Sequence, residues 1–165
     1  MFLTIVRHAK SSWDSPNLPD IVRPLNPRGL MAVGSMSEVV STMKLKADKV
    51  LCSAATRALH TAIGFSEVLS VNPATFEIAP QIYYGDVEDI INILQEMNNR
   101  FKDVWVFGHE PTLSGLGYEI CGFLPEKFPT CGILRIKLAI SNWAELFPNC
   151  GEKVFFLTPR DFSSK

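Results

Sequence analysis

The residues with the clearest potential for chemistry are two arginines and two histidines, namely Arg7, His8, Arg57 and His109. Arg7-His8 directly follows an apolar run at residues 2–6, and His109 follows a second one at residues 104–107. Guanidinium groups are planar, permanently charged forks of N–H donors that suit phosphate oxygens. A neutral imidazole is a nitrogen nucleophile near neutral pH. The pattern predicts an anion site in which a histidine attacks phosphorus.

Other interpretations of the histidines are weaker. A lone histidine at a strand end is usually structural, but here arginines and a second strand-end histidine accompany it. The histidines are far apart in sequence and lack HxH or HExxH spacing, so we expect no metal site and no cofactor. His60 lies on the same predicted helix as Arg57, and we interpret it as an ordinary packed or solvent-facing residue.

Apolar periodicity and turn residues predict alternating strands and helices. The predicted strands are at about residues 2–6, 49–52, 75–78, 104–107, 132–138 and 154–157. The predicted helices are at about residues 27–44, from near Arg57 to 69, 87–97 and 111–121. Asn26-Pro27 is typical of an N-cap followed by proline at the first helical position. Residues 11–26 are predicted to form a polar loop.

This alternation indicates an α/β fold, a three-layer α/β/α sandwich with a mainly parallel central sheet and an antiparallel final strand pair. In such sheets, ligands bind just beyond the carboxyl ends of the strands. Residues 7–8 and 109 each follow a predicted strand. We therefore expect them to face one pocket.

Composition excludes several classes of protein. The 165 residues fit a single domain spanning 1–165, and 47% hydrophobic content is ordinary for a globular protein. A net charge of −1 gives no reason to expect binding to nucleic acid or to an anionic membrane. The N-terminal apolar run is short and precedes its positive charges, unlike a secretory signal. The cysteines, Cys52, Cys121, Cys131 and Cys150, favour buried free thiols over disulfides or a metal site. We expect a cytoplasmic monomer.

Several segments together carry a family resemblance. They are Arg7 to Trp13, Arg23 to Gly29, Ser53 to Ala58, Gly108 to Leu113 and Phe155 to Arg160. This ordered set resembles the histidine phosphatase superfamily, and within it the short SixA-type phosphohistidine phosphatases. The resemblance implies a phosphoglycerate mutase-like fold. It also implies that His8 is the nucleophile that becomes phosphorylated, and that Arg7, Arg57 and His109 hold the phosphoryl oxygens.

The resemblance further implies a metal-independent phosphatase whose substrate is phosphohistidine on a protein, such as a histidine-containing phosphotransfer domain of a signalling relay. Superfamily members that cleave esters often use a carboxylic acid to protonate the leaving group. The candidates are Asp86, Glu88, Asp89 and Glu110, and no motif singles one out. Asp86 and Glu88 could equally begin a helix. Two alternatives stay open: a phosphatase of small phosphate monoesters, and a catalytically silent phosphate-binding module.

The surroundings of the predicted pocket are less defined. Only 51 residues separate Arg57 from His109, which leaves little chain there for a large lid and favours an open pocket. Trp13, Tyr83 and Tyr84 are interpreted as core or rim aromatics, with docking of a partner helix as the alternative. Ser11 and Asp14 could approach the phosphate or simply form a turn.

Overall fold

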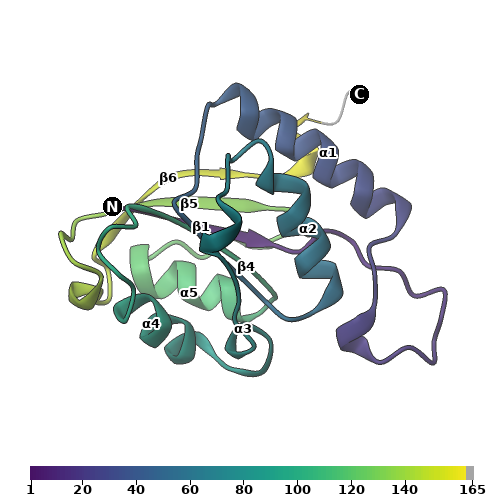
Figure 1. The fold of residues 1–165 in the computed structure, drawn as a ribbon, viewed down its shortest axis with the longest axis horizontal. Helices are drawn as coiled ribbons and strands as arrows, with labels where there is room; N and C mark the ends of the chain where they lie inside the picture. Colours follow the sequence, from purple (N-terminus) through teal and green to yellow (C-terminus); the bar gives the residue numbers. More distant parts are fainter. Residues whose placement is uncertain (163–165) are drawn as a thin grey trace.

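The computed structural model describes residues 1–162, which form one six-stranded sheet with helices on both faces (Figure 1). The strands are β1 (Phe2–Arg7), β2 (Lys49–Cys52), β3 (Phe76–Ile78), β4 (Asp103–Gly108), β5 (Ile133–Leu138) and β6 (Gly151–Leu157). The helices are α1 (Pro27–Thr42), α2 (Thr56–Ser66), α3 (Gln81–Tyr84), α4 (Val87–Gln95) and α5 (Thr112–Cys121).

The strand order is β3-β2-β4-β1-β5-β6. The first four strands in this order are parallel, and β5 runs antiparallel to both β1 and β6. The expected α/β sandwich with a mainly parallel sheet and an antiparallel final pair is thereby confirmed. Sequence periodicity missed α3 and the short 3₁₀ turn at Asp20–Val22, because elements this short have too few residues to show a period.

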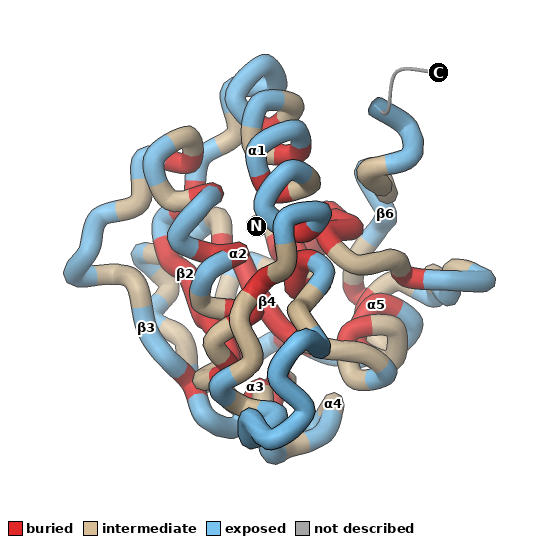
Figure 2. The backbone as a smooth tube through the Cα atoms, turned by 90° about the vertical axis from the view of Figure 1, so that its right-hand side faces the viewer, coloured by how far each residue is buried: buried red, intermediate tan, exposed pale blue. Residues whose placement is uncertain are grey.

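The two faces of the sheet bury separate hydrophobic clusters, which explains why β4 is apolar throughout. Val104 and Val106 belong to the cluster under α4 and α5, whereas Trp105 and Phe107 belong to the cluster under α1 and α2. Successive side chains of a strand point to opposite faces, so a strand covered on both sides must be apolar at every position. Figure 2 shows β2 and β4 buried in the middle of the molecule and the outer turns of α1 exposed.

Hydrogen bonds and close packing at the start of α1 also fix the loop that follows β1. Asn26 is the N-cap, as predicted, and its side chain accepts a hydrogen bond from the backbone N–H of Gly29. The backbone N–H of Asn26 donates to the carbonyl oxygen of Lys10. Gly29 lies so close to Lys10 that a Cβ atom there would overlap the same carbonyl. The segment just after His8 is therefore held against the first turn of α1.

The register of the sheet brings the carboxyl ends of β1, β2 and β4 together. Arg7 of β1 pairs with Gly108 of β4, and Cys52 of β2 pairs with Phe107 of β4. The ladder extends one residue further on each side, because His8 N–H donates to the Gly108 carbonyl and Ser53 N–H to the Phe107 carbonyl. The residues that follow these three neighbouring strands must consequently share one edge of the sheet.

All four cysteines are free thiols; Cys52, Cys131 and Cys150 are buried, and Cys121 is half-buried. Burial raises the pKa of Cys52 and of Cys131 to about 12, so neither is a reactive thiolate at neutral pH. None of the helices within residues 1–162 has the length and apolar character needed to cross a lipid bilayer.

Candidate active site

His8 sits directly beyond β1 and is buried, with only 8% of its surface exposed. Its Nδ1 lies 2.7 Å from the carbonyl oxygen of Ala9. Since a carbonyl only accepts, Nδ1 carries the proton and Nε2 carries the lone pair. Burial lowers the pKa of His8 to about 4, and the nearby Arg57 and Arg7 act in the same direction. His8 is therefore a neutral imidazole at pH 7, with the nucleophilic Nε2 free of hydrogen bonds within the described chain.

His109 faces His8 from the end of β4, with 4.9 Å between the ring centroids. Its Nε2 lies 2.7 Å from Oγ of Ser53, which itself accepts a hydrogen bond from the backbone N–H of Ala55. The Ser53 hydroxyl proton can thus donate to Nε2, which leaves the His109 proton on Nδ1. Burial, together with His8 and Arg57, lowers the pKa of His109 to about 3. His109 accordingly offers an N–H donor in the pocket while remaining uncharged.

Arg7, the last residue of β1, is held by one end of its guanidinium. Nη1 donates to the carbonyl oxygen of Phe128 at 2.6 Å. Burial lowers the pKa of Arg7, and the opposite charge of Glu110 partly offsets this effect. The guanidinium remains charged because the usual pKa of arginine lies far above neutral pH. Arg7 therefore brings a fixed positive charge beside His8.

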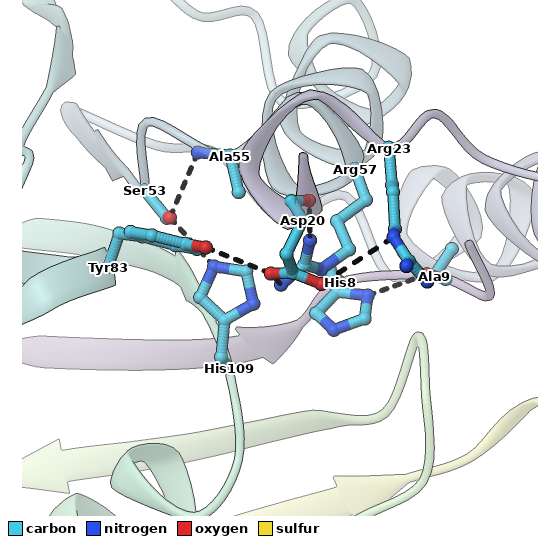
Figure 3. Close-up of polar contacts among 9 residues, drawn as sticks. All are labelled: His8, Ala9, Asp20, Arg23, Ser53, Ala55, Arg57, Tyr83 and His109. Atoms are coloured by element: carbon cyan, nitrogen blue, oxygen red, sulfur yellow. Dashed lines mark hydrogen bonds and ion pairs between the residues drawn. The ribbon is translucent and has the colours of Figure 1, made fainter. Parts of the chain in front are cut away.

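Arg57, in the first turn of α2, is paired with Asp20 (Figure 3). Its Nη1 donates to the Asp20 carbonyl at 2.7 Å, and its Nη2 donates to Oδ2 of the Asp20 carboxylate at 2.8 Å. The hydroxyl of Tyr83 donates to the same Oδ2 at 2.9 Å. Burial acts to raise the pKa of Asp20, but these hydrogen bonds prevail and hold it below its usual value. An ionised carboxylate therefore sits at the mouth of the pocket.

Arg23, which follows the Asp20 turn, is a third guanidinium at this site (Figure 3). Its Cζ lies 3.6 Å from the ring centroid of Trp13, so the guanidinium stacks on the indole face. Its Nε is 3.9 Å from Oδ1 of Asp20, which is an ion pair but too long for a hydrogen bond. Trp13 and Asp20 thus fix the guanidinium from two sides.

Buried side-chain nitrogens that lack a hydrogen-bond partner gather at this site. Among the described residues, the buried side-chain nitrogens without a hydrogen-bond partner are Nε of Arg7, Nε and Nη1 of Arg23, and Nδ1 of His109. All belong to the cluster around His8. Buried donors are normally paired, so unpaired ones indicate a missing acceptor. The acceptor that fits unpaired donors on two arginines and a histidine is an oxyanion.

Sequence comparison identifies the family. The sequence model of the histidine phosphatase superfamily, branch 1, matches residues 3–124. The chain belongs to this superfamily. An uncharacterised protein of Mycobacterium tuberculosis is 32% identical, and the match covers 94% of this chain and 100% of that protein. An uncharacterised protein of Mycobacterium leprae is 28% identical, with 94% of this chain and 100% of that protein covered.

Solved structures agree with this assignment. The protein histidine phosphatase SixA complexed with tungstate matches with a TM-score of 0.83 and 26% identity, over 99% of this chain and 100% of that one. The mycobacterial glucosyl-3-phosphoglycerate phosphatase matches with a TM-score of 0.67 and 11% identity, over 92% of this chain and 96% of that one. The histidine phosphatase described here therefore has the SixA-type, phosphoglycerate mutase-like fold.

The structure brings together the four residues that the sequence singled out, Arg7, His8, Arg57 and His109. Sequence reasoning did not assign Asp20, Arg23, Ser53 or Tyr83 to this site. An Asp-x-x-Arg spacing at residues 20–23, in the loop after His8, was the available signal for the first two. The segment between Arg57 and His109 contributes Tyr83 to this site, whereas Asp20 and Arg23 come from the loop after His8.

Three of the four carboxylates considered as general acids already accept hydrogen bonds within the protein. Asp86 and Asp89 form the capping box of α4, in which each side chain accepts from the other's backbone N–H. Glu110 accepts from the backbone and the hydroxyl of Ser114 in α5. Glu88 is exposed in the first turn of α4. Asp86, Asp89 and Glu110 thus accept hydrogen bonds from backbone N–H groups at helix N-termini.

Trp13, Tyr83 and Tyr84 lie at the rim of the site and not in the core. Trp13 is 70% exposed and Tyr84 is 74% exposed, while Tyr83 packs edge-on against His109 at 5.5 Å between ring centroids. Asp14 is exposed and accepts from the Ser12 hydroxyl, which is a turn contact. His60 is exposed on α2. Within residues 1–162, no group of three His, Cys, Asp or Glu side chains is placed to hold a metal ion.

Proposed function

We propose that this phosphatase removes the phosphoryl group from phosphohistidine on a protein, such as a histidine-containing phosphotransfer domain, without a metal ion and through a phosphorylated His8. One observation carries the proposal. The Ala9 carbonyl fixes the proton of His8 on Nδ1, so Nε2 carries its lone pair into the cluster of Arg7, Arg57 and His109.

The chemistry follows from this geometry. Nε2 of His8 attacks phosphorus, and the leaving group departs on the opposite side, toward the mouth. Preorganised donors on Arg7, Arg57 and His109 stabilise charge on the non-bridging oxygens in the transition state. The Ala9 carbonyl stabilises the positive charge that forms on the His8 ring. Water then hydrolyses phosphorylated His8 and regenerates the free enzyme.

The hydrogen bonds of the candidate acids within residues 1–162 support a P–N substrate. Asp86, Asp89 and Glu110 are engaged in helix caps, and the carboxylate at the mouth, Asp20, is held ionised. An alkoxide needs a proton in order to leave, whereas a protonated imidazole ring leaves as neutral imidazole. Exposure of the neighbouring side chains also supports a large substrate, because Trp13, which stacks on Arg23, and Tyr84, next to Tyr83, are largely exposed. The likeness to SixA, a protein histidine phosphatase, agrees with this proposal.

The test measures substrate preference and the covalent intermediate together. Purified protein is given a ³²P-labelled phosphotransfer domain, phosphoimidazole, and alkyl and aryl phosphates, with and without EDTA. We expect the P–N substrates to give the highest kcat/KM, EDTA to have no effect, and label to appear on the protein as an acid-labile phosphoramidate.

His8→Gln is the matched variant, because glutamine retains a polar side chain at this buried position. It should lose on the order of 10⁴-fold in kcat, as for other covalent nucleophiles, and should carry no label. A wild-type preference for alkyl phosphates would favour the small-ester alternative. Equal labelling of wild type and His8→Gln would exclude His8 as the nucleophile.

A further inference from the structure

We propose that Asp20 selects the leaving group, by accepting a hydrogen bond from the ring N–H of the phosphorylated imidazole that is distal to phosphorus. This inference rests on the proposed function and assigns Asp20 a role in substrate specificity. The ligand class is a protonated phosphoimidazole ring, in which one nitrogen bears phosphorus and the other bears a proton.

The first support is the free oxygen of the Asp20 carboxylate. Oδ2 is occupied, because it accepts from Nη2 of Arg57 and from the Tyr83 hydroxyl. Oδ1 accepts no hydrogen bond from the described residues, and Nε of Arg23 is 3.9 Å away from it. The carboxylate is thus oriented by two fixed donors while one oxygen remains open, and its side chain is 51% exposed.

The second support is the position of this oxygen relative to the reacting atoms. The negative charge of Asp20 acts on both His8 and His109, raising the pKa of each against the effect of burial. In the view of Figure 3 the Asp20 carboxylate is drawn between the imidazole rings of His8 and His109. A ring held between these two histidines would therefore lie within reach of Asp20.

The third support is a symmetry between the two imidazoles of the reaction. His8 donates from Nδ1 to the Ala9 carbonyl, which stabilises a positive ring once Nε2 is phosphorylated. Asp20 would give the same stabilisation to the substrate ring before it leaves. The bond from His8 Nε2 to phosphorus forms, and the P–N bond of the substrate breaks. Its electron pair stays on the ring nitrogen, and the ring leaves as neutral imidazole with its distal proton still in place.

The charge of Asp20 explains how the site would distinguish P–N substrates from P–O substrates. A carboxylate beside a phosphoryl group repels it, and an ester leaving group brings nothing that offsets this repulsion. A protonated phosphoimidazole brings both a positive charge and an N–H donor, and charge-assisted hydrogen bonds are the stronger ones. Asp20 should therefore disfavour P–O substrates and favour P–N substrates.

The experiment compares Asp20→Asn with wild type on phosphoimidazole and on 4-nitrophenyl phosphate. We expect the ratio of the two kcat/KM values to fall at least tenfold in the variant, and Asp20→Glu to restore part of it. Asp14→Asn, which changes an exposed carboxylate in the same loop, should keep the wild-type ratio. Inhibition by tungstate reports separately on the oxyanion site, where Arg57 still donates to the Asp20 backbone carbonyl.

Each result decides the matter. A lower ratio with tungstate inhibition retained supports a role in selecting the leaving group. An unchanged ratio, or equal losses on both substrates together with weaker tungstate inhibition, would mean that Asp20 only braces Arg57, and would overturn this inference while the proposed function stands. A wild-type enzyme that cleaves 4-nitrophenyl phosphate but not phosphoimidazole would overturn the proposed function and this inference together.

Discussion

Two arginine–aspartate pairs lie at opposite ends of the same sheet and are built differently. Arg135 of β5 makes two contacts with the carboxylate of Asp103, at 3.1 and 2.5 Å, and donates to Thr4 at 2.7 Å. It also stacks on Phe2, with 4.4 Å from Cζ to the ring centroid. Arg57 instead reaches over the carboxyl end of the strands to Asp20, half of whose side chain is exposed.

The two pairs differ in how completely their partners are enclosed. The Asp103 carboxylate is mostly buried and accepts additionally from Trp105, and burial raises its pKa despite Arg135. The Asp20 carboxylate keeps an open oxygen, and its pKa is lowered. An enclosed pair holds its two elements together, whereas a pair with open atoms at a strand end can exchange partners with a ligand. Removal of the Arg135–Asp103 pair should therefore lower stability, whereas removal of the Arg57–Asp20 pair should lower activity.

The largest expected effect is on stability at the enclosed pair. Arg135→Met leaves the Asp103 carboxylate buried without its cation, which should lower the free energy of unfolding by about 3–5 kcal/mol. Urea denaturation at pH 7 measures the loss. The double variant Arg135→Met/Asp103→Asn should recover much of it, because no unpaired charge remains. Activity per folded molecule should stay near wild type, and a selective loss of activity would contradict a purely structural role.

The next largest effect is on catalysis, and it comes from the pair of Arg57 and Asp20. Arg57→Ala should lower kcat/KM by roughly 100-fold, the scale for losing one preorganised charge-stabilising donor. Arg57→Lys should recover only part, since an ammonium lacks the planar fork. Arg100→Ala, an exposed arginine before β4 at the opposite end of the sheet, is the control. Full activity of Arg57→Lys would show that the fork geometry is unimportant.

The histidines should make folding sensitive to acid. The usual pKa of histidine is 6.5, and the folded values are about 4 for His8 and about 3 for His109. The unfolded chain thus binds more protons below pH 6.5, so stability is full above that pH and falls as the pH drops toward 4. Between pH 7 and 5 each histidine should remove about 2 kcal/mol. Urea denaturation of His109→Gln at both pH values should show a smaller loss than wild type, and an equal loss would exclude this cause.

Sequence reasoning located His8 and the charged residues around it because each lies at or beside a strongly patterned element. Arg7 ends a strand that is largely apolar, His8 and His109 come directly after such strands, and parallel pairing then aligns those strand ends. Arg57 sits in the first turn of a helix whose apolar spacing is regular. The geometry of α/β sheets predicted that the strand-end residues share one pocket, and the family resemblance supplied the expected roles of these residues and of Arg57.

The same reasoning could not place the mouth of the site. Asp20 and Arg23 belong to a non-periodic loop, and contact with Arg57 across 37 residues depends on tertiary packing. It also could not foresee that a strand-end histidine would be buried, because burial of His8 results from the loop held against α1. The exposed Trp13 was ambiguous for the same reason, since its stacking partner Arg23 is set by that loop.

The smallest effect should come from removing the hydrogen bond that the Tyr83 hydroxyl donates to Asp20. Tyr83→Phe removes the hydroxyl that donates to Oδ2 of Asp20 but keeps the ring against His109. A neutral donor to a half-exposed carboxylate contributes about 1 kcal/mol, so kcat/KM should fall about fivefold. Tyr84→Phe is the matched control, because Tyr84 is a more exposed neighbour whose ring contacts Tyr83 at 4.8 Å. If both variants behaved alike, Tyr83 would not orient Asp20, and Arg57 alone would hold that carboxylate in place.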